Sequence, residues 1–269
     1  MRSTLKITSA MKLVASSKLL KAQRAIDALR PYEQALSRIV SSLPAGGTAE
    51  SEAREGLPTV LLAFSGNTSM CGAFNSNVIK LTLRTLRSCE GPVQVWAFGR
   101  KMADALRKNG TPAVRDFSSL AGSPSSAEAA GISAELRSLY GEGRIGRVLL
   151  VYNHFVSTGR QEPRVEAFLP YSAPVCEGGS APADDLYYIY EPSAEALARS
   201  LVPQVLDLRL YAALLDSAAA EHAARMVAMQ AATDNGEELL SELTLEYNKG
   251  RQQKITSEIL DLIGGETQS

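Results

Sequence analysis

Apolar residues in the last third of the chain recur at spacings of three and four, the period of one face of an α-helix. No proline occurs after Pro203 up to Ile263. A helix of that length spans about 90 Å, several times the width of a small domain. We therefore predict a terminal helical segment over residues 192–269, with Pro203 in the first turn of its long helix. Such a helix must lie against another long element or inside a partner protein.

Two places in this segment weaken the prediction of one unbroken helix. Asp234-Asn235-Gly236 is a typical turn sequence, and Gly250 is a second weak point. Each glycine costs about 1 kcal/mol relative to alanine inside a helix. Because the apolar period resumes after both places, the pattern favours a continuous helix over a break at Asn235.

The first 43 residues show a similar period and predict a second long helix. Its apolar stripe is expected to begin at Ile7, Met11 and Val14, while Pro31 is expected to kink the helix or to remove one hydrogen bond. The terminal helix carries alanines along its own stripe, which let two helix backbones approach closely. The two helices are therefore predicted to pair as an antiparallel coiled coil. The later positions of the N-terminal stripe are Ala22, Ile26, Leu29, Leu36 and Val40.

The middle of the chain changes character. Short apolar runs rich in β-branched residues alternate there with helix-like stretches. This alternation is typical of βαβ units and predicts a small, mostly parallel sheet with helices on its faces. The expected strands cover 59–64, 92–98 and 147–153, with an edge strand over 164–170.

These elements predict an α/β fold in three parts. A helix over residues 1–43 and the terminal helix over 192–269 form the coiled coil, and an α/β domain over 58–190 is inserted between them. The segments 41–58 and 171–186 have the composition of loops.

Charge is balanced overall but uneven along the chain. The formal net charge is −1, so no general attraction to nucleic acid is expected. Residues 2–30 nevertheless contain seven basic side chains and only one acidic one, Asp27. This stretch is either a solvated helix face or a surface for an acidic partner.

Candidate chemistry is sparse. The sequence contains neither a phosphate-binding loop nor a dinucleotide fingerprint, and its three cysteines are too scattered for a metal site. One nucleophile is conceivable: Cys71 precedes an expected helix, and His154 follows an expected strand and could act as its base. The alternative is that Cys71 is a small apolar residue in a tight loop. A free-standing α/β enzyme thus remains open, as does a coiled-coil adaptor.

A polar cluster lies near the end of the terminal helix. Arg251, Gln252 and Thr256 fall within about one turn of one another and are expected to project to one side. Such a patch could hold a partner's loop by hydrogen bonds, or it could be an ordinary solvated face. Arg225 and Asn248 are further polar residues in and beyond the small-residue stripe.

Two long segments at opposite ends of the chain resemble one known family. AARMVAMQAATDNGEELLSELTLEYNKGRQQKITSEI, from residue 223, resembles the C-terminal signature of the γ subunit of F-type ATP synthase. KITSAMKLVASSKLLKAQRAIDALRPYEQAL, from residue 6, resembles that family's N-terminal helix. With the α/β middle, the resemblance covers essentially the whole chain. It implies an antiparallel coiled coil with an inserted Rossmann-like domain, and it supports a continuous helix through Asn235.

The resemblance implies a rotor shaft without an active site, cofactor or metal of its own. The coiled coil would enter a head of three α and three β subunits, and the globular part would contact the ε subunit and the membrane c-ring. Such a protein would be peripheral to the cytoplasmic side of a bacterial inner membrane. By position, Met11 and Arg225 match residues that couple the shaft to an acidic region of β, and Arg251, Gln252 and Thr256 match contacts with a β catch loop.

The sequence also departs from the family pattern. The family's N-terminal helix begins about three turns earlier, so the first residues here are expected to align inside it. The family's middle loop resembles Asp-Lys/Arg-Gly-Leu-Cys-Gly, whereas residues 67–72 read Asn-Thr-Ser-Met-Cys-Gly. A basic contact from this loop is therefore not expected.

Overall fold

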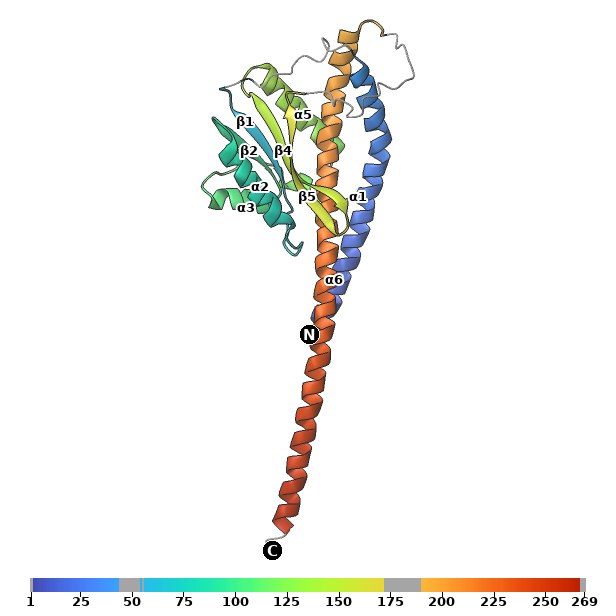
Figure 1. Cartoon of the computed structure of the whole chain (residues 1–269), viewed down its shortest axis with the longest axis vertical. Helices are drawn as coiled ribbons and strands as arrows, with labels where there is room; N and C mark the ends of the chain where they lie inside the picture. The colour runs from blue at the N-terminus through green and yellow to red at the C-terminus, as the bar shows by residue number, and fades with distance from the viewer. Residues whose placement is uncertain (1, 44–53, 55, 172–189, 267–269) are drawn as a thin grey trace.

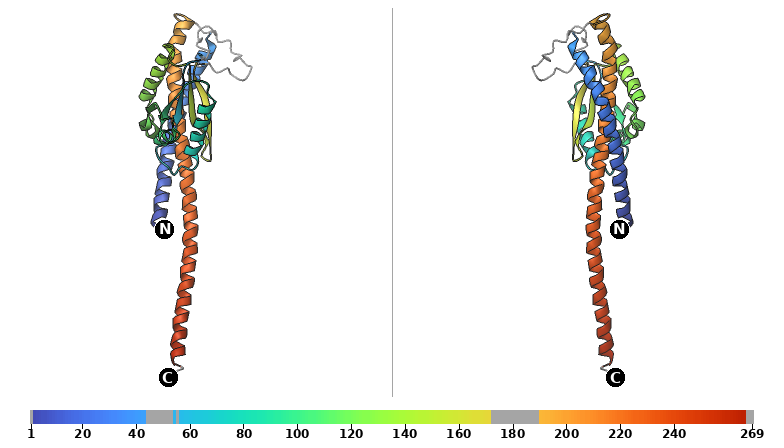
Figure 2. Two further views of the ribbon diagram at one scale, coloured as in Figure 1. Left: turned by 90° about the vertical axis from the view of Figure 1, so that its left-hand side faces the viewer. Right: turned by 90° about the vertical axis from the view of Figure 1, so that its right-hand side faces the viewer.

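Two long antiparallel helices form the axis of the molecule. A computed structural model describes residues 2–43, 54, 56–171 and 190–266. Helix α1 (Arg2–Ser42) and helix α6 (Ala194–Glu266) lie side by side, and the α/β part packs against their upper half (Figures 1 and 2). The N-terminus lies partway along α6, so the last turns of α6 extend beyond α1 (Figure 1). The predicted pairing of the two terminal helices is confirmed.

Small and aliphatic residues fill the interface between the two helices. Leu19 and Ala22 of α1 pack against Ala219 and Ala223 of α6, and these alanines allow close approach. Ile26 and Met226 lie at the margin of this cluster.

The expected start of the α1 stripe was one residue out of register. Ile7 and Val14 are each 57% exposed, whereas Ala15 is buried and Thr8 Oγ1 accepts a hydrogen bond from Thr233 Oγ1 at 2.9 Å. A coiled-coil face repeats every 3.5 residues, so Thr8, Ala15 and Ala22 share it, and residues one position earlier turn about 100° away.

Helix α6 is continuous through both weak points, as the apolar period predicted. At Gly236 an added Cβ would lie 2.6 Å from Leu5 Cδ2, so glycine lets α1 approach α6 closely there. At Gly250 nothing lies within 4 Å of such a Cβ. Neither glycine breaks the helix, because the residues on both sides of each glycine favour helix.

Two prolines, Pro31 and Pro203, lie inside the long helices. Helix α1 continues through Pro31, which is exposed on the solvent side. The prediction that Pro203 marks the first turn of α6 was wrong, since the helix begins at Ala194. Ser193 precedes that start, and its Oγ accepts a hydrogen bond from the Ala196 backbone N at 3.2 Å, as helix-capping residues do.

The α/β part contains a five-stranded sheet in the order β3-β2-β1-β4-β5. The first four strands in this order pair in parallel. Strand β5 lies at the edge, as predicted, and pairs antiparallel with β4. Sequence analysis did not predict strand β3, because a strand of two residues shows no hydrophobic pattern. The strands are β1 (Thr59–Phe64), β2 (Val93–Phe98), β3 (Arg115–Asp116), β4 (Arg147–Ser157) and β5 (Arg160–Leu169).

Helices cover both faces of the sheet. Helices α2 (Phe74–Ser88) and α3 (Arg100–Lys108) enclose one core with Leu61 and Ala63 of β1. Helices α4 (Ser118–Gly122), α5 (Ser126–Gly141) and the upper part of α6 cover the other face, where β1 contributes Val60, Leu62 and Phe64. Because α6 belongs to this second core, the sheet and the helical axis share one hydrophobic interior.

In the part of the chain that the structure describes, no helix has both the length and the apolar character needed to cross a membrane. Most of the loop expected over residues 41–58 and of that over 171–186 lies outside the described residues.

Candidate partner-binding surface

The free end of α6 presents apolar side chains to solvent. Every residue from 241 to 259 is exposed, among them Leu243, Leu245 and Tyr247. Successive residues lie about 100° apart around a helix, so these side chains fall on more than one face. Large apolar side chains exposed in this way mark an interaction surface. The exposed apolar residues of this segment are Leu243 47%, Leu245 70%, Tyr247 69%, Ile255 45% and Ile259 50%.

The predicted polar cluster lies on this free end. Gln252 and Thr256 are one turn apart, and Thr256 Oγ1 donates to the Gln252 carbonyl at 2.9 Å. Arg251 and Gln252 are also exposed to solvent. Gln252 also lines a shallow groove with Arg2 and Asn248, where the start of α1 meets α6. These side chains are therefore accessible to a partner.

The outer face of α1 carries both apolar and basic groups. Ile7, Leu13, Val14 and Leu20 are each about half exposed or more. Most of the basic residues of this helix are exposed beside them, and Met11 is half-buried at the edge of the coiled-coil interface. A partner for this face would need both apolar and acidic groups. The exposed basic residues are Arg2, Lys6, Lys18, Lys21, Arg24 and Arg30.

Arg225 lies in a different environment from the rest of the predicted set. Its side chain is only 12% exposed, and its Nη2 donates to Glu221 Oε1 at 2.6 Å and to Thr68 Oγ1 at 2.7 Å. Thr68 belongs to the loop after β1, so Arg225 ties that loop to α6. Glu221 is also buried. A Cβ added at Gly66 would lie 2.8 Å from the Cδ of Glu221, which explains why position 66 is a glycine.

His222 is half-buried on α6. Burial, together with the positive charges of Arg225 and Lys18, lowers the pKa of His222 to about 4. The imidazole is therefore neutral at physiological pH. Two consecutive polar residues such as Glu221 and His222 are typical of an exposed face, but Glu221 is paired with Arg225 inside the fold.

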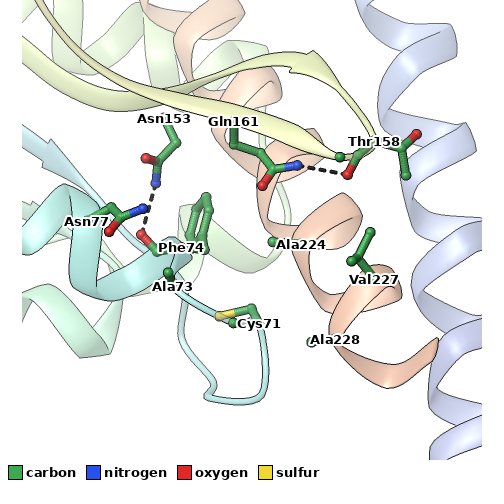
Figure 3. A pocket seen from close by; sticks show the side chains of 12 residues that line it. Cys71, Ala73, Phe74, Asn77, Asn153, Thr158, Gln161, Ala224, Val227 and Ala228 are labelled. Carbon is green, nitrogen blue, oxygen red and sulfur yellow. Dashed lines mark hydrogen bonds between the residues drawn. The ribbon is translucent and has the colours of Figure 1, made fainter. Parts of the chain in front are cut away.

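Cys71 is buried and 1% exposed. Burial raises the pKa of its thiol, against the opposing effect of Arg225, and Asn75 Nδ2 lies 3.1 Å from its Sγ. A pocket of about 200 Å³ opens beside it, between the loop after β1, the β4–β5 hairpin and α6 (Figure 3). The side chains drawn around Cys71 in Figure 3 are apolar, amide or hydroxyl groups, and none of them is a base.

His154 does not face Cys71. It lines another pocket, and its Nδ1 contacts Asp216 Oδ2 instead. A protonated thiol without a base is a poor nucleophile, so the structure does not favour the enzyme alternative. Sequence reasoning missed Asp216, Glu221 and Thr68, because each acts through a partner far away in the chain. Among the described residues, no group of three or more His, Cys, Asp or Glu could hold a metal ion.

Comparison with known proteins identifies the family to which this chain belongs. A family model described as ATP synthase matches residues 1–267. The ATP synthase gamma chain of Bacteroides thetaiotaomicron is 43% identical, with 99% of this chain and 95% of that protein covered. The gamma chain of Moorella thermoacetica is 37% identical, with 98% and 93% covered.

Solved structures share the fold. The chain is similar to a chain of the central stalk and c-ring of Tetrahymena thermophila mitochondrial ATP synthase, with a TM-score of 0.62, 20% identity, and 84% of this chain and 99% of that chain covered. A chain of the Euglena gracilis mitochondrial ATP synthase rotor gives a TM-score of 0.60 at 19% identity, with 94% and 97% covered. Matched by the family model over nearly its whole length and by close relatives end to end, the chain belongs to the family of ATP synthase gamma chains.

Proposed function

We propose that this chain is the rotor shaft of an F-type ATP synthase, and that it couples proton-driven rotation of a membrane ring to ATP synthesis, or the reverse, in a catalytic head. The observation that carries the proposal is the free end of α6, residues 241–259, whose exposed apolar side chains point in several directions. A surface of this kind suits a helix enclosed by partners on all sides. The subunit itself is non-catalytic.

The mechanism follows from the asymmetry of the shaft. A pair of helices has no threefold symmetry, so it must contact three surrounding β subunits differently. Only contacts that differ between two states can shift the equilibrium between them. Each orientation of the shaft would thus give the three catalytic sites different nucleotide affinities, and rotation would exchange them.

The partners of this proposal are three α and three β subunits, the ε subunit and the c-ring. Supporting it, the similar Tetrahymena chain belongs to a central stalk with a c-ring, and the similar Euglena chain belongs to a rotor. A gamma chain is a peripheral part of a membrane complex, and we propose the cytoplasmic side of a bacterial inner membrane for this one. We also propose that residues 1–43 and 192–269 act as the shaft and residues 58–190 as the globular domain.

Five residues are proposed to act in contact with β. Arg251, Gln252 and Thr256 are exposed and adjacent, which supports a direct grip on a β loop. Met11 lies at the edge of the coiled coil beside the basic outer face of α1. Arg225 is enclosed by Glu221 and Thr68, so its effect on β would pass through the loop after β1 unless that loop moves.

Reconstitution tests the proposal. The purified chain is mixed with α and β subunits of the same organism, and ATP hydrolysis and rotation of the assembled head are measured. We expect an assembly with one copy of this chain that hydrolyses ATP and rotates. A chain ending at residue 240 serves as the control and should lose rotation. If the full chain forms no such assembly, the rotor function is refuted.

A further inference from the structure

A carboxylate of α6, that of Asp216, binds the β4–β5 hairpin at two neighbouring residues. Asp216 Oδ2 contacts Nδ1 of His154, and Asp216 Oδ1 accepts a hydrogen bond from the backbone N of Phe155 at 3.1 Å. Two consecutive residues of β4 are thus held by one side chain of α6. A carboxylate that binds two neighbouring donors fixes the direction of the strand as well as its position.

This contact lies where three parts of the molecule meet. The Phe155 ring packs against the cluster of Leu19, Ala22, Ala219 and Ala223, which joins α1 to α6. It also borders the cluster of Cys71, Phe74 and Ala220, which joins the loop after β1 to α6. The Asp216 contacts therefore hold in place a ring that both clusters share.

The pair is largely withdrawn from solvent. The Asp216 side chain is 16% exposed and that of His154 is 32% exposed. Burial raises the pKa of Asp216, and the contacts with His154, Phe155 and Arg164 act in the opposite direction. A buried carboxylate depends strongly on its donors, so the charge on His154 matters more here than on the surface.

Other ionisable groups face the pair from every neighbouring element. They provide charges of both signs around a pocket of about 300 Å³. Tyr152 donates to Glu166 at 2.9 Å, and Arg209 donates to the Ala167 carbonyl at 3.2 Å, so both already have partners. The facing groups are Arg30 and Glu33 of α1, Tyr152 of β4, Arg164 and Glu166 of β5, and Arg209 of α6.

We propose that Asp216 and His154 form a positioning joint that sets the angle of the α/β domain on the coiled coil, and that the joint is tighter when His154 is protonated. An imidazolium–carboxylate bond is charge-assisted and about twice as strong as a neutral hydrogen bond. Histidine changes charge in the physiological pH range. The joint is thus strongest when the imidazole carries its proton and Asp216 is ionised. Because burial raises the pKa of Asp216, the joint also loosens where that carboxylate takes up a proton at low pH.

Hydrogen exchange on the full purified chain tests the joint between pH 5.5 and 8.5, with rates corrected for intrinsic exchange. In the wild type we expect protection of residues 152–166 to fall about fivefold across this range. His154→Lys keeps a charged donor and should remove most of the pH dependence while keeping protection. His154→Gln and Asp216→Asn should both show low, pH-independent protection.

The chain supplies its own control. His222 is the second of two histidines, and its low pKa leaves it neutral throughout this range, so His222→Gln should behave as the wild type. A wild-type chain without pH dependence, or an Asp216→Asn chain that retains it, overturns the proposal.

The consequence for coupling rests on the proposed function and is measured separately. In the assembled ATP synthase, the ratio of proton pumping to ATP hydrolysis should fall with rising pH more steeply for the wild type than for His154→Lys. If exchange follows the predicted pattern but no rotating complex assembles, the joint stands and the rotor function fails. If the complex works and exchange shows no dependence on His154, the joint fails alone.

Discussion

At the scale of single residues, polar groups of α6 divide into exposed and internal ones. Arg251 and Gln252 are open to a partner, whereas Arg225 and Glu221 form a buried ion pair that also binds Thr68. Sequence analysis placed Arg225 and Arg251 in one functional set, but they lie in different environments. A buried pair is sensitive to loss of one member, because the other is left charged without a partner.

Arg225→Met should therefore lower the free energy of unfolding by about 3 kcal/mol, since Glu221 stays buried without its counter-ion. The measurement is urea unfolding followed by circular dichroism. Adding Glu221→Gln to this variant should recover part of the loss. Arg24→Met, at an exposed position of α1, is the control and should change stability little. Equal effects at positions 225 and 24 would show that the buried pair has no special role.

At the scale of elements, the coiled coil depends on small residues at its closest approach. Ala219 and Ala223 are fully buried against Leu19 and Ala22, and Gly236 meets Leu5 further along. Little space remains at these positions for a larger side chain. The close approach also brings α6 within reach of the β4–β5 hairpin, whose Phe155 borders the same cluster.

Ala223→Leu should destabilise the fold by about 1–3 kcal/mol, because the added atoms force α1 and α6 apart. Ala232→Leu places the same side chain on an exposed position of the same helix and should alter stability by about 0.5 kcal/mol or less. Thermal unfolding of both variants gives the comparison. A harmless Ala223→Leu would mean that the two helices are not tightly packed there.

At the scale of the whole molecule, α6 has two roles in one continuous element. Its upper part completes the core that covers one face of the sheet, and its lower part extends beyond α1 with all residues from 241 to 259 exposed. A force applied to the α/β domain is thus transmitted to the free end through covalent helix and shared core, without a flexible linker in α6 between them.

Gln252→Leu and Arg251→Ala are expected to weaken the grip of the free end in an assembled ATP synthase. Loss of one hydrogen bond corresponds to roughly a fivefold change in an equilibrium, so ATP-driven proton pumping should fall relative to ATP hydrolysis. Both activities are measured on membrane vesicles. Lys108→Ala, at the exposed end of α3, is the control. Unchanged pumping in both variants would remove these residues from the proposed contact with β.

The sequence by itself determined the elements and their order. The 3–4 period predicted two long helices, the period resuming after Gly236 indicated that α6 is continuous, and the short apolar runs marked four of the five strands. These are local patterns, because an α-helix or a strand repeats over a few residues.

Only the tertiary structure decided which groups meet. The seam of α1 runs through Thr8 and Ala15, not through Ile7 and Val14, because the position of α6 selects the face. Likewise, Arg225 is enclosed by Thr68, and His154 is bound to Asp216 and not to Cys71. Each of these pairs joins residues 62 or more positions apart, so no local pattern contains them. The physical reason is that burial and charge pairing depend on the packing of distant elements, whereas periodicity depends only on the neighbours in the chain.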